Sequence, residues 1–384
     1  MSIAAEVRAG IAPEWAALAR GGPLFASGGW LRAMDGRLGG ETVTIIVSEN
    51  GEPAVAALAS VQTSPAPREV FDLHYIFVNP APPLPLTDAT RAARARLEGA
   101  APPPARWLPS LVVMLPGYEC LPVGPGRRDA RLLGELVDAA CAWAAGQGLR
   151  AAAFLYTRPE DVGLAAALGD RGFTGVPLSV TWELPVPPGG FPGYLAALPP
   201  RRRKETRREL ALIERAGVRI GELDRDSLGS ESALARLAGL RGQLAAKYGR
   251  VTDPRSELAR LRTLITEVGT GHARVISAVA GDAMIGFALF CPSGSTWYCL
   301  AVGYDYSDPR SKLCYFGTAF YGAVPVAAAA GASWLSYGQG AARAKRSRGS
   351  VGTPLTCWVH TDDPALAAAI ETSAAVTKLE YIIG

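Results

Sequence analysis

The chain has 384 residues, about twice the usual domain length, which favours two domains. Hydrophobic residues make up 49% and charged residues 19%, which supports a sizeable core and argues against an intrinsically disordered chain. The net charge of +4 is well short of the strongly basic balance of a dedicated nucleic-acid-binding domain.

The cysteine pattern and the N-terminal residues bear on location. No cysteine forms a C-x-x-C pair or lies near a histidine at metal-ligand spacing, so we expect reduced, buried thiols and no metal site. The N-terminal residues lack the pattern of a signal peptide, and no apolar run reaches the length of a membrane span. These features predict a soluble, cytoplasmic protein. The cysteines are Cys120, Cys141, Cys291, Cys299, Cys314 and Cys357.

The first half of the chain has the pattern of an α/β unit. Its strongest local signal is the Asn50-Gly51 turn between two strand-like runs, which is typical of a β-hairpin. The expected elements, in chain order, are a short helix around 12–20, a helix beginning within 25–31, strands at 42–48, 53–62, 111–114 and 118–122, a helix at 127–147, a strand at 149–155, a helix at 160–169 and a strand at 176–184.

A proline- and glycine-rich break at 185–193 separates the two halves. We therefore predict an N-terminal domain at 1–185, a linker at 186–196 and a C-terminal, catalytic domain at 197–384.

The second half repeats the same order at greater length. Its expected elements are a basic helix at 199–216, a strand at 217–222, helices at 228–247 and 254–268, strands at 272–280, 283–290 and 295–302, a helix at 315–331, a strand at 333–337, a short helix within 338–349, a strand at 354–360, a helix at 363–375 and a strand at 376–382. An antiparallel meander followed by alternating helices and strands predicts a mixed α/β (α+β) sheet flanked by helices. Because both halves share this order, we predict a duplicated fold.

A series of short motifs runs through the second half. In chain order they are Tyr194-Leu195, Arg202-Arg203-Lys204, Arg207-Arg208, Gly303-Tyr304-Asp305-Tyr306, Tyr315-Phe316-Gly317, Ala330-Gly331, Tyr337-Gly338-Gln339-Gly340, Lys345 and Gly349. Their order and spacing resemble the FemAB-like and BioF2-like acyltransferases of the GNAT (acetyltransferase) superfamily. In the first half, Phe25 through Trp30 is similar to the short N-terminal signature of the same groups.

This resemblance implies two tandem GNAT-like domains and an acyltransferase that forms an amide bond. FemAB-like enzymes take an amino acid from aminoacyl-tRNA, whereas other relatives use acyl-CoA. The acceptor would be an amine of a small molecule or peptide, in biosynthesis of the natural-product or cell-wall type. No tightly bound cofactor is implied.

One stretch departs from the acetyl-CoA-dependent pattern. Those enzymes carry a glycine-rich loop after the third meander strand, whose backbone N–H groups cradle a pyrophosphate. This chain has Arg310-Ser311-Lys312-Leu313-Cys314-Tyr315-Phe316-Gly317 instead, with one glycine and bulky aromatics. We therefore favour aminoacyl-tRNA as the donor over acyl-CoA.

Acyl transfer from an activated ester or thioester requires a neutral amine, a stabilised oxyanion and positioning of the reactants. Backbone N–H groups near Tyr298 to Leu300 are candidates for the oxyanion site if the strand at 295–302 splays from its neighbour. Asp305 is the candidate for handling the amine proton, since partial burial would raise its pKa. Alternatively, Asp305 caps a turn before Asp308-Pro309.

Aromatic and histidine side chains are the candidates for substrate contact. Trp297 and Tyr298 lie on opposite faces of one strand, so one should face the core and the other the site; Tyr298 is placed with the catalytic candidates. The predicted substrate-binding set comprises Trp297, Tyr304, Tyr315, Gln339 and His360, with a structural role as the alternative for His360.

Two polar residues follow the strand at 333–337, where an open α/β sheet places ligand-binding loops. Gln339 is the first, and Lys345 is predicted to contact a phosphate or the donor carbonyl. A solvated surface lysine is the alternative.

The basic run at 201–208 predicts contact with RNA or a phosphorylated substrate. Arg203 and Arg207 stand at i and i+4 on one helical face. Arg202 and, in a second cluster, Arg343 complete the predicted phosphate-binding set, and a solvated helical face is the alternative.

Two other functions stay open. One is an N-acyltransferase that depends on acyl-CoA or acyl-carrier protein. The other is a non-catalytic GNAT-like pair that binds RNA or a cell-wall precursor.

Overall fold

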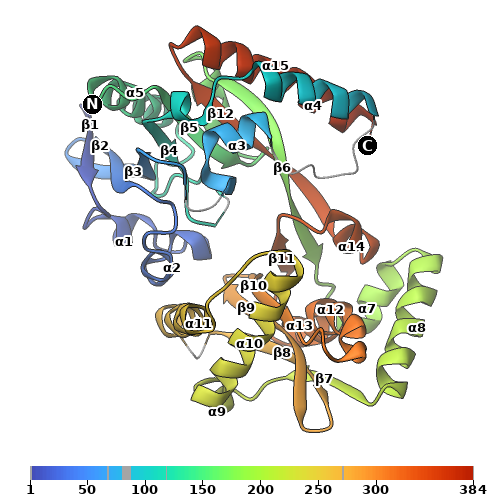
Figure 1. Cartoon of the computed structure of the whole chain (residues 1–384). Helices are drawn as coiled ribbons and strands as arrows, with labels where there is room; N and C mark the ends of the chain where they lie inside the picture. The colour runs from blue at the N-terminus through green and yellow to red at the C-terminus, as the bar shows by residue number, and fades with distance from the viewer. Residues whose placement is uncertain (1, 67–68, 80–87, 118, 270–271, 384) are drawn as a thin grey trace. The chain divides into compact units, whose positions relative to one another are not determined.

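The computed structural model describes residues 2–66, 69–79, 88–117, 119–269 and 272–383, with side chains up to 377. The chain divides into two compact units, Met1–Thr181 with Thr353–Gly384 (unit 1) and Trp182–Gly352 (unit 2). Figure 1 gives the labels of the elements used below.

Unit 1 is an α/β unit with the strand order β1-β2-β3-β4-β5-β12-β6. Its strands are β1 (Ile3–Ala9), β2 (Glu41–Glu49), β3 (Glu52–Gln62), β4 (Ser110–Val113), β5 (Ala151–Thr157), β6 (Thr174–Pro185) and β12 (Val351–His360). Its helices are α1 (Trp15–Leu18), α2 (Gly28–Ala33), α3 (Leu73–Val78), α4 (Asp88–Ala100), α5 (Ala130–Gly146), α6 (Val162–Gly169) and α15 (Pro364–Ile383), with short 3₁₀ turns at Leu24–Ala26, Glu69–Phe71 and Pro104–Trp107.

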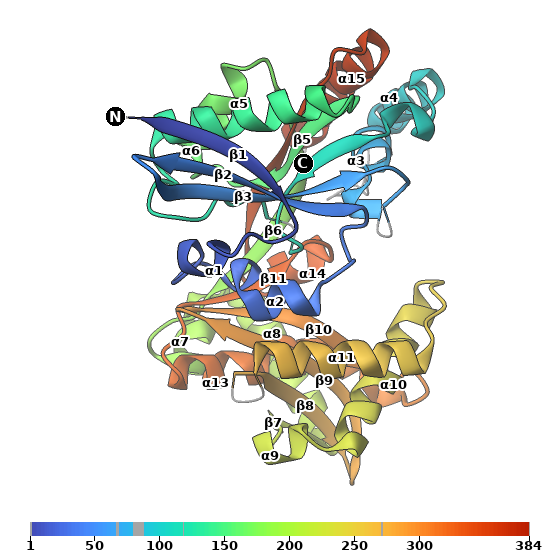
Figure 2. The same cartoon turned by 90° about the vertical axis from the view of Figure 1, so that its left-hand side faces the viewer.

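Both faces of the unit 1 sheet are covered. Along β5, Ala151, Ala153 and Leu155 belong to one buried cluster, which also holds residues of α3 and α15. Ala152 and Phe154 belong to the other, with residues of α5 and α6. This alternation follows from the two-residue repeat of a strand, and it explains why β5 reads as a continuous apolar run. Figure 2 shows α5 over one face of these strands.

Unit 2 has the strand order β6-β11-β10-β9-β8-β7. Its strands are β7 (Val218–Glu222), β8 (Arg274–Ala280), β9 (Ala283–Ser293), β10 (Thr296–Tyr304) and β11 (Trp334–Gly338), together with the end of β6. Its helices are α7 (Gly190–Ala197), α8 (Pro200–Arg215), α9 (Arg225–Leu228), α10 (Glu231–Lys247), α11 (Pro254–Val268), α12 (Cys314–Phe316), α13 (Ala323–Ala329) and α14 (Ala342–Ser347), with a 3₁₀ turn at Pro309–Leu313 and a π-helical turn at Gly317–Gly322.

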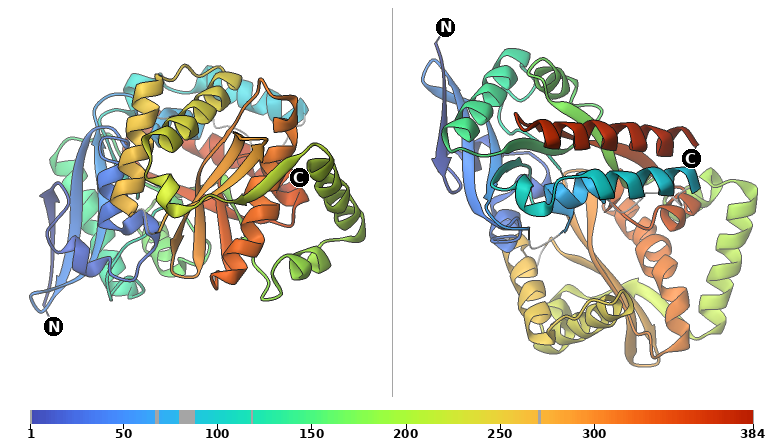
Figure 3. Two further views of the ribbon diagram at one scale, coloured as in Figure 1. Left: turned by 90° about the horizontal axis from the view of Figure 1, so that it is seen from below. Right: turned by 45° about the horizontal axis from the view of Figure 1, so that its top comes forward.

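Helices cover the unit 2 strands on both faces as well. In the left panel of Figure 3, the yellow helices α10 and α11 lie on one side of the orange strands, and α13 lies on the other. A close approach of α10 to β10 depends on Gly303, since a Cβ there would lie 2.7 Å from the backbone N of Arg241. On the opposite face, one buried cluster joins α7, α13 and the π-helical turn to the strands.

Most predicted elements are confirmed, with some differences. The predicted strand at 376–382 is wrong, because these residues continue the helix α15, whose apolar residues pack into unit 1. The strand β1 and the helices α3 and α4 were not predicted. For the predicted strand at 118–122, residue 118 lies outside the described residues, and 119–122 hold only an isolated bridge between Leu115 and Glu119.

The two units divide the chain differently from the predicted boundaries at 185 and 197. Residues 353–384 belong to unit 1, and the predicted linker at 186–196 contains most of α7. Tyr194, within that stretch, is 2% exposed in the unit 2 core and donates from its hydroxyl to the carbonyl of Arg348. A proline- and glycine-rich composition therefore marks here the start of a packed helix.

Candidate functional site

The strands β10 and β11 of unit 2 pair over a short distance only. Their parallel register covers Thr296 with Trp334, Trp297 with Leu335 and Tyr298 with Ser336. Beyond Tyr298, β10 continues to Tyr304 beside β9, but no further residue of it is registered with β11. The two strands therefore part after Tyr298, as the splay expected from the sequence requires.

Both strands are irregular at the point where they part. On β10, the register with β9 shifts between Cys299 and Ala301, which leaves Leu300 without a partner residue on β9. On β11, the register with β6 shifts between Ser336 and Gly338, which does the same for Tyr337. Such bulges re-aim the backbone and are common next to active sites. In a regular sheet, backbone N–H and C=O groups pair with the neighbouring strand. At these bulges, such groups lie at the opening between β10 and β11 instead.

Lys345 lies at this opening with a buried ammonium group. Its side chain, 4% exposed, donates to the carbonyl oxygens of Tyr337 (2.9 Å), Gly338 (3.0 Å) and Gln339 (2.9 Å). An ammonium group has three hydrogens, and each has one of these acceptors. Lys345 therefore holds the carbonyl end of β11 where strand pairing with β10 has stopped.

The turn between β11 and α14 is built to bring Lys345 back to the strand. Gly338, Gly340 and Ala341 all have positive φ, at 60°, 77° and 49°. Glycine adopts this conformation without steric cost, and the tight turn reverses the chain within a few residues. The motif Tyr337-Gly338-Gln339-Gly340 thus has a backbone reason as well as its resemblance.

Burial changes the ionisation of the groups at the opening. Burial lowers the pKa of Lys345 to about 8, with the Cys299 thiol acting in the opposite direction. Burial raises the pKa of Cys299 to about 12, and the lysine lowers it in turn. At neutral pH the lysine is charged and the thiol is not.

Gln339 offers a hydrogen-bond donor at the same place. The residue is half-buried, its backbone carbonyl accepts from Lys345, and its side-chain Nε2 is buried without a hydrogen-bond partner in the described structure. A buried amide donor without a partner is uncommon in folded proteins and fits a group that meets a ligand.

Unit 1 shows no comparable opening between its parallel strands, as far as its described residues go. β4 and β5 pair from Ser110 with Ala151 to Val113 with Phe154. Beyond that pairing, the backbone N–H of Cys120 donates to the carbonyl of Tyr156 at 3.3 Å, so the chain after β4 stays joined to β5. The candidate site is therefore the opening in unit 2.

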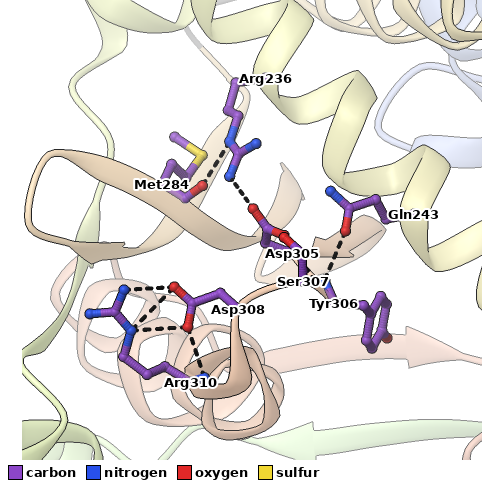
Figure 4. Close-up of polar contacts among 8 residues, drawn as sticks. All are labelled: Arg236, Gln243, Met284, Asp305, Tyr306, Ser307, Asp308 and Arg310. Carbon is purple, nitrogen blue, oxygen red and sulfur yellow. Dashed lines mark hydrogen bonds and ion pairs between the residues drawn. The ribbon is translucent and has the colours of Figure 1, made fainter.

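Asp305 forms an ion pair, and the prediction that burial raises its pKa is wrong. Figure 4 shows its carboxylate between Arg236, with Nη2 to Oδ2 at 2.7 Å, and the hydroxyl of Ser307 at 2.5 Å. Hydrogen bonds from Ser307 and Arg236 lower the pKa of Asp305 to about 2. Such a carboxylate stays ionised at neutral pH and is a weak proton acceptor. The alternative, a turn-capping role, is confirmed by its acceptance of the Ser307 backbone N–H at 3.2 Å.

Asp308 lies two residues before the segment 310–317, which was compared with a pyrophosphate-binding loop. Its carboxylate accepts the backbone N–H of Arg310 at 2.9 Å, and the Arg310 side chain folds back onto it at 2.6 Å (Figure 4). Asp308 thus caps the 3₁₀ turn Pro309–Leu313, and the Arg310 guanidinium balances the charge of its carboxylate.

The predicted aromatic set is divided by the fold. Trp297 (2% exposed) and Tyr304 (3% exposed) lie in the buried cluster of unit 2, which contradicts their predicted contact with substrate. Tyr298 is half-buried on the opposite face of β10, as the strand alternation predicted, and Tyr315 packs half-buried against the core. His360 belongs to β12 in unit 1, where its ring lies 5.4 Å from that of Phe173.

The predicted phosphate-binding arginines are also divided. Arg202 pairs with Glu205 at 2.7 Å, and Arg203 donates to the carbonyl oxygens of Ala196 and Leu198 at the end of α7. Their guanidinium groups thus serve contacts within the protein. Arg207 and Arg343 are exposed.

The sequence did not reveal three charged residues that form ion pairs in unit 2. Arg236 pairs with Asp305, and Arg348 pairs with Glu209. Arg348 is 2% exposed, and its guanidinium donates to Glu209 at 2.5 Å and to the Tyr321 hydroxyl at 2.7 Å. The two glutamates of the basic helix at i and i+4, Glu205 and Glu209, are the available signal, since carboxylates within a basic run indicate internal pairing.

Two further observations concern the described residues alone. They contain no group of three or more histidine, cysteine, aspartate and glutamate side chains placed to hold a metal ion. No helix among them has both the length and the apolar character needed to cross a bilayer.

Comparison with known proteins identifies the fold. No family model and no curated protein matches the sequence. The crystal structure of FemX covers 95% of this chain and 100% of its own, with a TM-score of 0.61 and 14% sequence identity. The chain has the fold of FemX. The predicted mixed α/β fold class is confirmed, with helices flanking the sheet in each of the two units.

Two other solved structures are more distant. The C-terminal domain (DUF2156) of a lysylphosphatidylglycerol synthetase from Agrobacterium fabrum has a TM-score of 0.48 and 15% identity, covering 68% of this chain and 82% of its own. A tandem GNAT protein from the clavulanic acid biosynthesis pathway has a TM-score of 0.43 and 12% identity, covering 84% and 83%. Below a TM-score of 0.5, these likenesses add nothing to the FemX comparison.

Proposed function

We propose that the protein is an acyltransferase that forms an amide bond at the opening between β10 and β11 of unit 2. The observation that supports this most directly is the end of strand pairing at Tyr298 and Ser336, with a bulge on each strand next to it. The fold shared with FemX agrees with an acyl-transfer function.

The oxyanion of the reaction is stabilised by backbone and side-chain donors at the opening. Leu300 lies at the β10 bulge, past the last residue registered with β11, so its N–H is the first candidate donor. The unpartnered Nε2 of Gln339 is the second. Preorganised donors of this kind lower the barrier because they need no reorganisation as charge develops.

Lys345 is a positioning residue in this proposal. Its ammonium hydrogens are engaged by three carbonyl oxygens, so it acts through the loop that carries Gln339. Its positive charge behind the opening also favours a developing oxyanion. Because Asp305 stays ionised and paired, the acceptor amine loses its proton to solvent or to a substrate group.

The donor that we propose is aminoacyl-tRNA, and the acceptor is an amine of a small molecule or peptide. Asp308 argues against coenzyme A, because its carboxylate already takes the N–H of Arg310, the first residue of the segment that stands in place of a glycine-rich loop. An aminoacyl ester at the end of an RNA needs no pyrophosphate cradle. Its acyl carbon is activated enough for attack by an amine without a covalent enzyme intermediate.

The test begins with binding of a bulk aminoacylated tRNA pool, compared with acetyl-CoA, at physiological salt. Retention of charged tRNA with one amino acid enriched supports the proposed donor and names the residue transferred. Binding of acetyl-CoA alone overturns it in favour of the acyl-CoA alternative.

A matched pair of variants then tests the site. Leu300→Pro removes the proposed N–H donor at a bulge, where proline is tolerated best, and Leu300→Ala keeps the N–H. We expect the proline variant to lose about 100-fold or more in turnover, as for loss of one oxyanion donor, and the alanine variant to stay near wild type. Equal activity of the two folded variants would overturn the assignment of the site.

A further inference from the structure

On the basic helix α8, some charged side chains form contacts within the protein and others are exposed. Its inward carboxylate Glu209 binds Arg348, and Glu205 binds Arg202. Arg203 is bound to backbone carbonyl oxygens. Both glutamates are therefore paired with arginines outside the set of cations considered next. That set, called the α8 cationic face below, is Arg201, Lys204, Arg207 and Arg208.

The α8 cationic face is exposed, and its side chains form no ion pair with the described residues. All four residues are exposed, and no ion pair or hydrogen bond of their side chains occurs in the described part of the chain. Positions 201, 204 and 208 follow the i, i+3, i+7 spacing of one helical face, with 207 beside them. The four charges span about 10 Å of helix, over which a nucleic-acid duplex carries about six backbone charges.

The surroundings of the face favour a polar polyanion over a membrane. Of the larger apolar side chains of α8, Ile213 is buried, Leu210 packs against the core and Leu212 is half-buried. The next exposed position is Ala211. A helix that lies in a membrane surface needs large apolar side chains on the immersed side, which this face lacks. In Figures 1 and 3, α8 lies at the periphery of unit 2 with one side uncovered by other elements of that unit.

The face is also held rigidly. The buried Arg348 donates to both Glu209 of α8 and Tyr321 of the π-helical turn, and Tyr321 donates to Glu209 as well. A charged helix fixed in this way binds a partner without first being ordered, which favours affinity.

We propose that Arg201, Lys204, Arg207 and Arg208 bind the phosphate backbone of the RNA that carries the acyl group. The assignment of that RNA as aminoacyl-tRNA rests on the proposed function. This set differs from the arginines expected from the sequence, because Arg202 and Arg203 are engaged within the protein.

Binding of deacylated tRNA tests the face without any need for activity. The full chain is compared with the variant R201Q/K204Q/R207Q/R208Q, in which glutamine keeps the length and helix propensity of the side chains. The control R20Q/R96Q/R127Q/R128Q removes four exposed cations of unit 1 and so changes the net charge equally. Fluorescence anisotropy is measured from 50 to 300 mM salt.

We expect the α8 variant to bind tRNA more than about tenfold more weakly than wild type. The slope of log K against log salt concentration should become less steep by about three, as for the loss of four phosphate contacts. The control should keep nearly the wild-type slope. Equal losses in both variants, or none in the α8 variant, would overturn the inference. So would loss of binding to anionic phospholipid vesicles by the α8 variant while its tRNA binding is unchanged.

Transfer assays separate this inference from the proposed function. We expect the α8 variant to lose kcat/KM with full-length aminoacyl-tRNA, but to match wild type with a short aminoacylated CCA oligonucleotide, which lacks the phosphate backbone of the tRNA stem. If wild type transfers from neither donor, the proposed donor is wrong, and the tRNA-binding comparison still decides the role of the face. Equal losses with both donors would place the variant's effect at the site and overturn the inference.

Discussion

The buried guanidinium of Arg348 and the half-buried carboxylate of Glu209 form an ion pair, 2.5 Å from Nη2 to Oε1, across 139 residues of sequence. The guanidinium also lies 3.8 Å from the centre of the Phe316 ring, so it is enclosed on its face as well as at its edge. The pair fastens the basic helix α8 to the loop that follows α14. The ion pair therefore links α8, which carries the cationic face, to the segment that carries Lys345.

Arg348→Met is expected to lower the free energy of unfolding by about 1.5–3 kcal/mol, because Glu209 loses its charged hydrogen-bond donor and keeps the Tyr321 hydroxyl. The double variant Arg348→Met/Glu209→Met should be more stable than Arg348→Met, since no half-buried charge is left over. Urea unfolding of the three proteins measures both values. A double variant that is less stable than the single one would show that the pair contributes little beyond packing.

Lys345 is expected to make stability depend on pH in alkaline solution. Its pKa is lowered to about 8 in the folded protein from 10.5, so between these values the unfolded chain binds the proton and the folded chain does not. The contribution of Lys345 to stability therefore rises as pH increases from about 8 to about 10.5, by up to about 3 kcal/mol. Buried tyrosines and thiols titrate nearby in the opposite direction, so the difference between wild type and Lys345→Met isolates the effect.

Lys345→Met should also loosen the loop that carries Gln339, because three carbonyl oxygens lose their donor. Hydrogen exchange of residues 337–345 measures this directly. Protection equal to that of wild type would contradict a positioning role for the lysine.

Asp305→Asn should change how stability depends on pH in acid, and should leave the pH profile of turnover unchanged. The pKa of Asp305 is about 2, below its usual value of 3.8, so its contribution is present above about pH 4 and is lost as pH falls towards 2. We expect the variant to lose about 1 kcal/mol at neutral pH, as for a largely surface ion pair, and to lack this acid dependence.

Arg236→Gln is the matched control, because it removes the other half of the Asp305 ion pair. Both variants should keep the wild-type pH profile of turnover between pH 5 and 9. Loss of an ionisation from that profile in Asp305→Asn alone would restore a proton-transfer role for the aspartate.

Leu366→Ala should destabilise unit 1 and leave unit 2 unchanged. Leu366 is fully buried in the cluster that joins α15 to β5 and β12, so its truncation should cost about 2–5 kcal/mol. Hydrogen exchange should show lost protection in residues 119–181 and 353–377, with residues 190–347 as in wild type. Loss of protection confined to 190–347 would contradict the assignment of the C-terminal segment to unit 1.

The sequence by itself determined the local elements of both units and their order. Asn50, with φ at 52°, and Gly51 form the predicted turn between β2 and β3, and the strand and helix periods locate most elements to within a few residues. Such signals are local, because turn chemistry and side-chain period involve neighbouring residues only. The repeated order of elements was enough to predict two units of mixed α/β structure.

Tertiary structure decided how the charged and aromatic residues are used. Arg202, Arg203, Arg207 and Arg208 are alike in sequence, but only the fold brings Glu209 to Arg348. The fold also leaves the cations of the α8 cationic face without an ion pair among the described residues. Likewise, the parting of β10 from β11 and the burial of Lys345 depend on strands that come together from separate parts of the chain. Burial and pairing set ionisation and exposure, and these depend on contacts between distant residues that a local pattern does not encode.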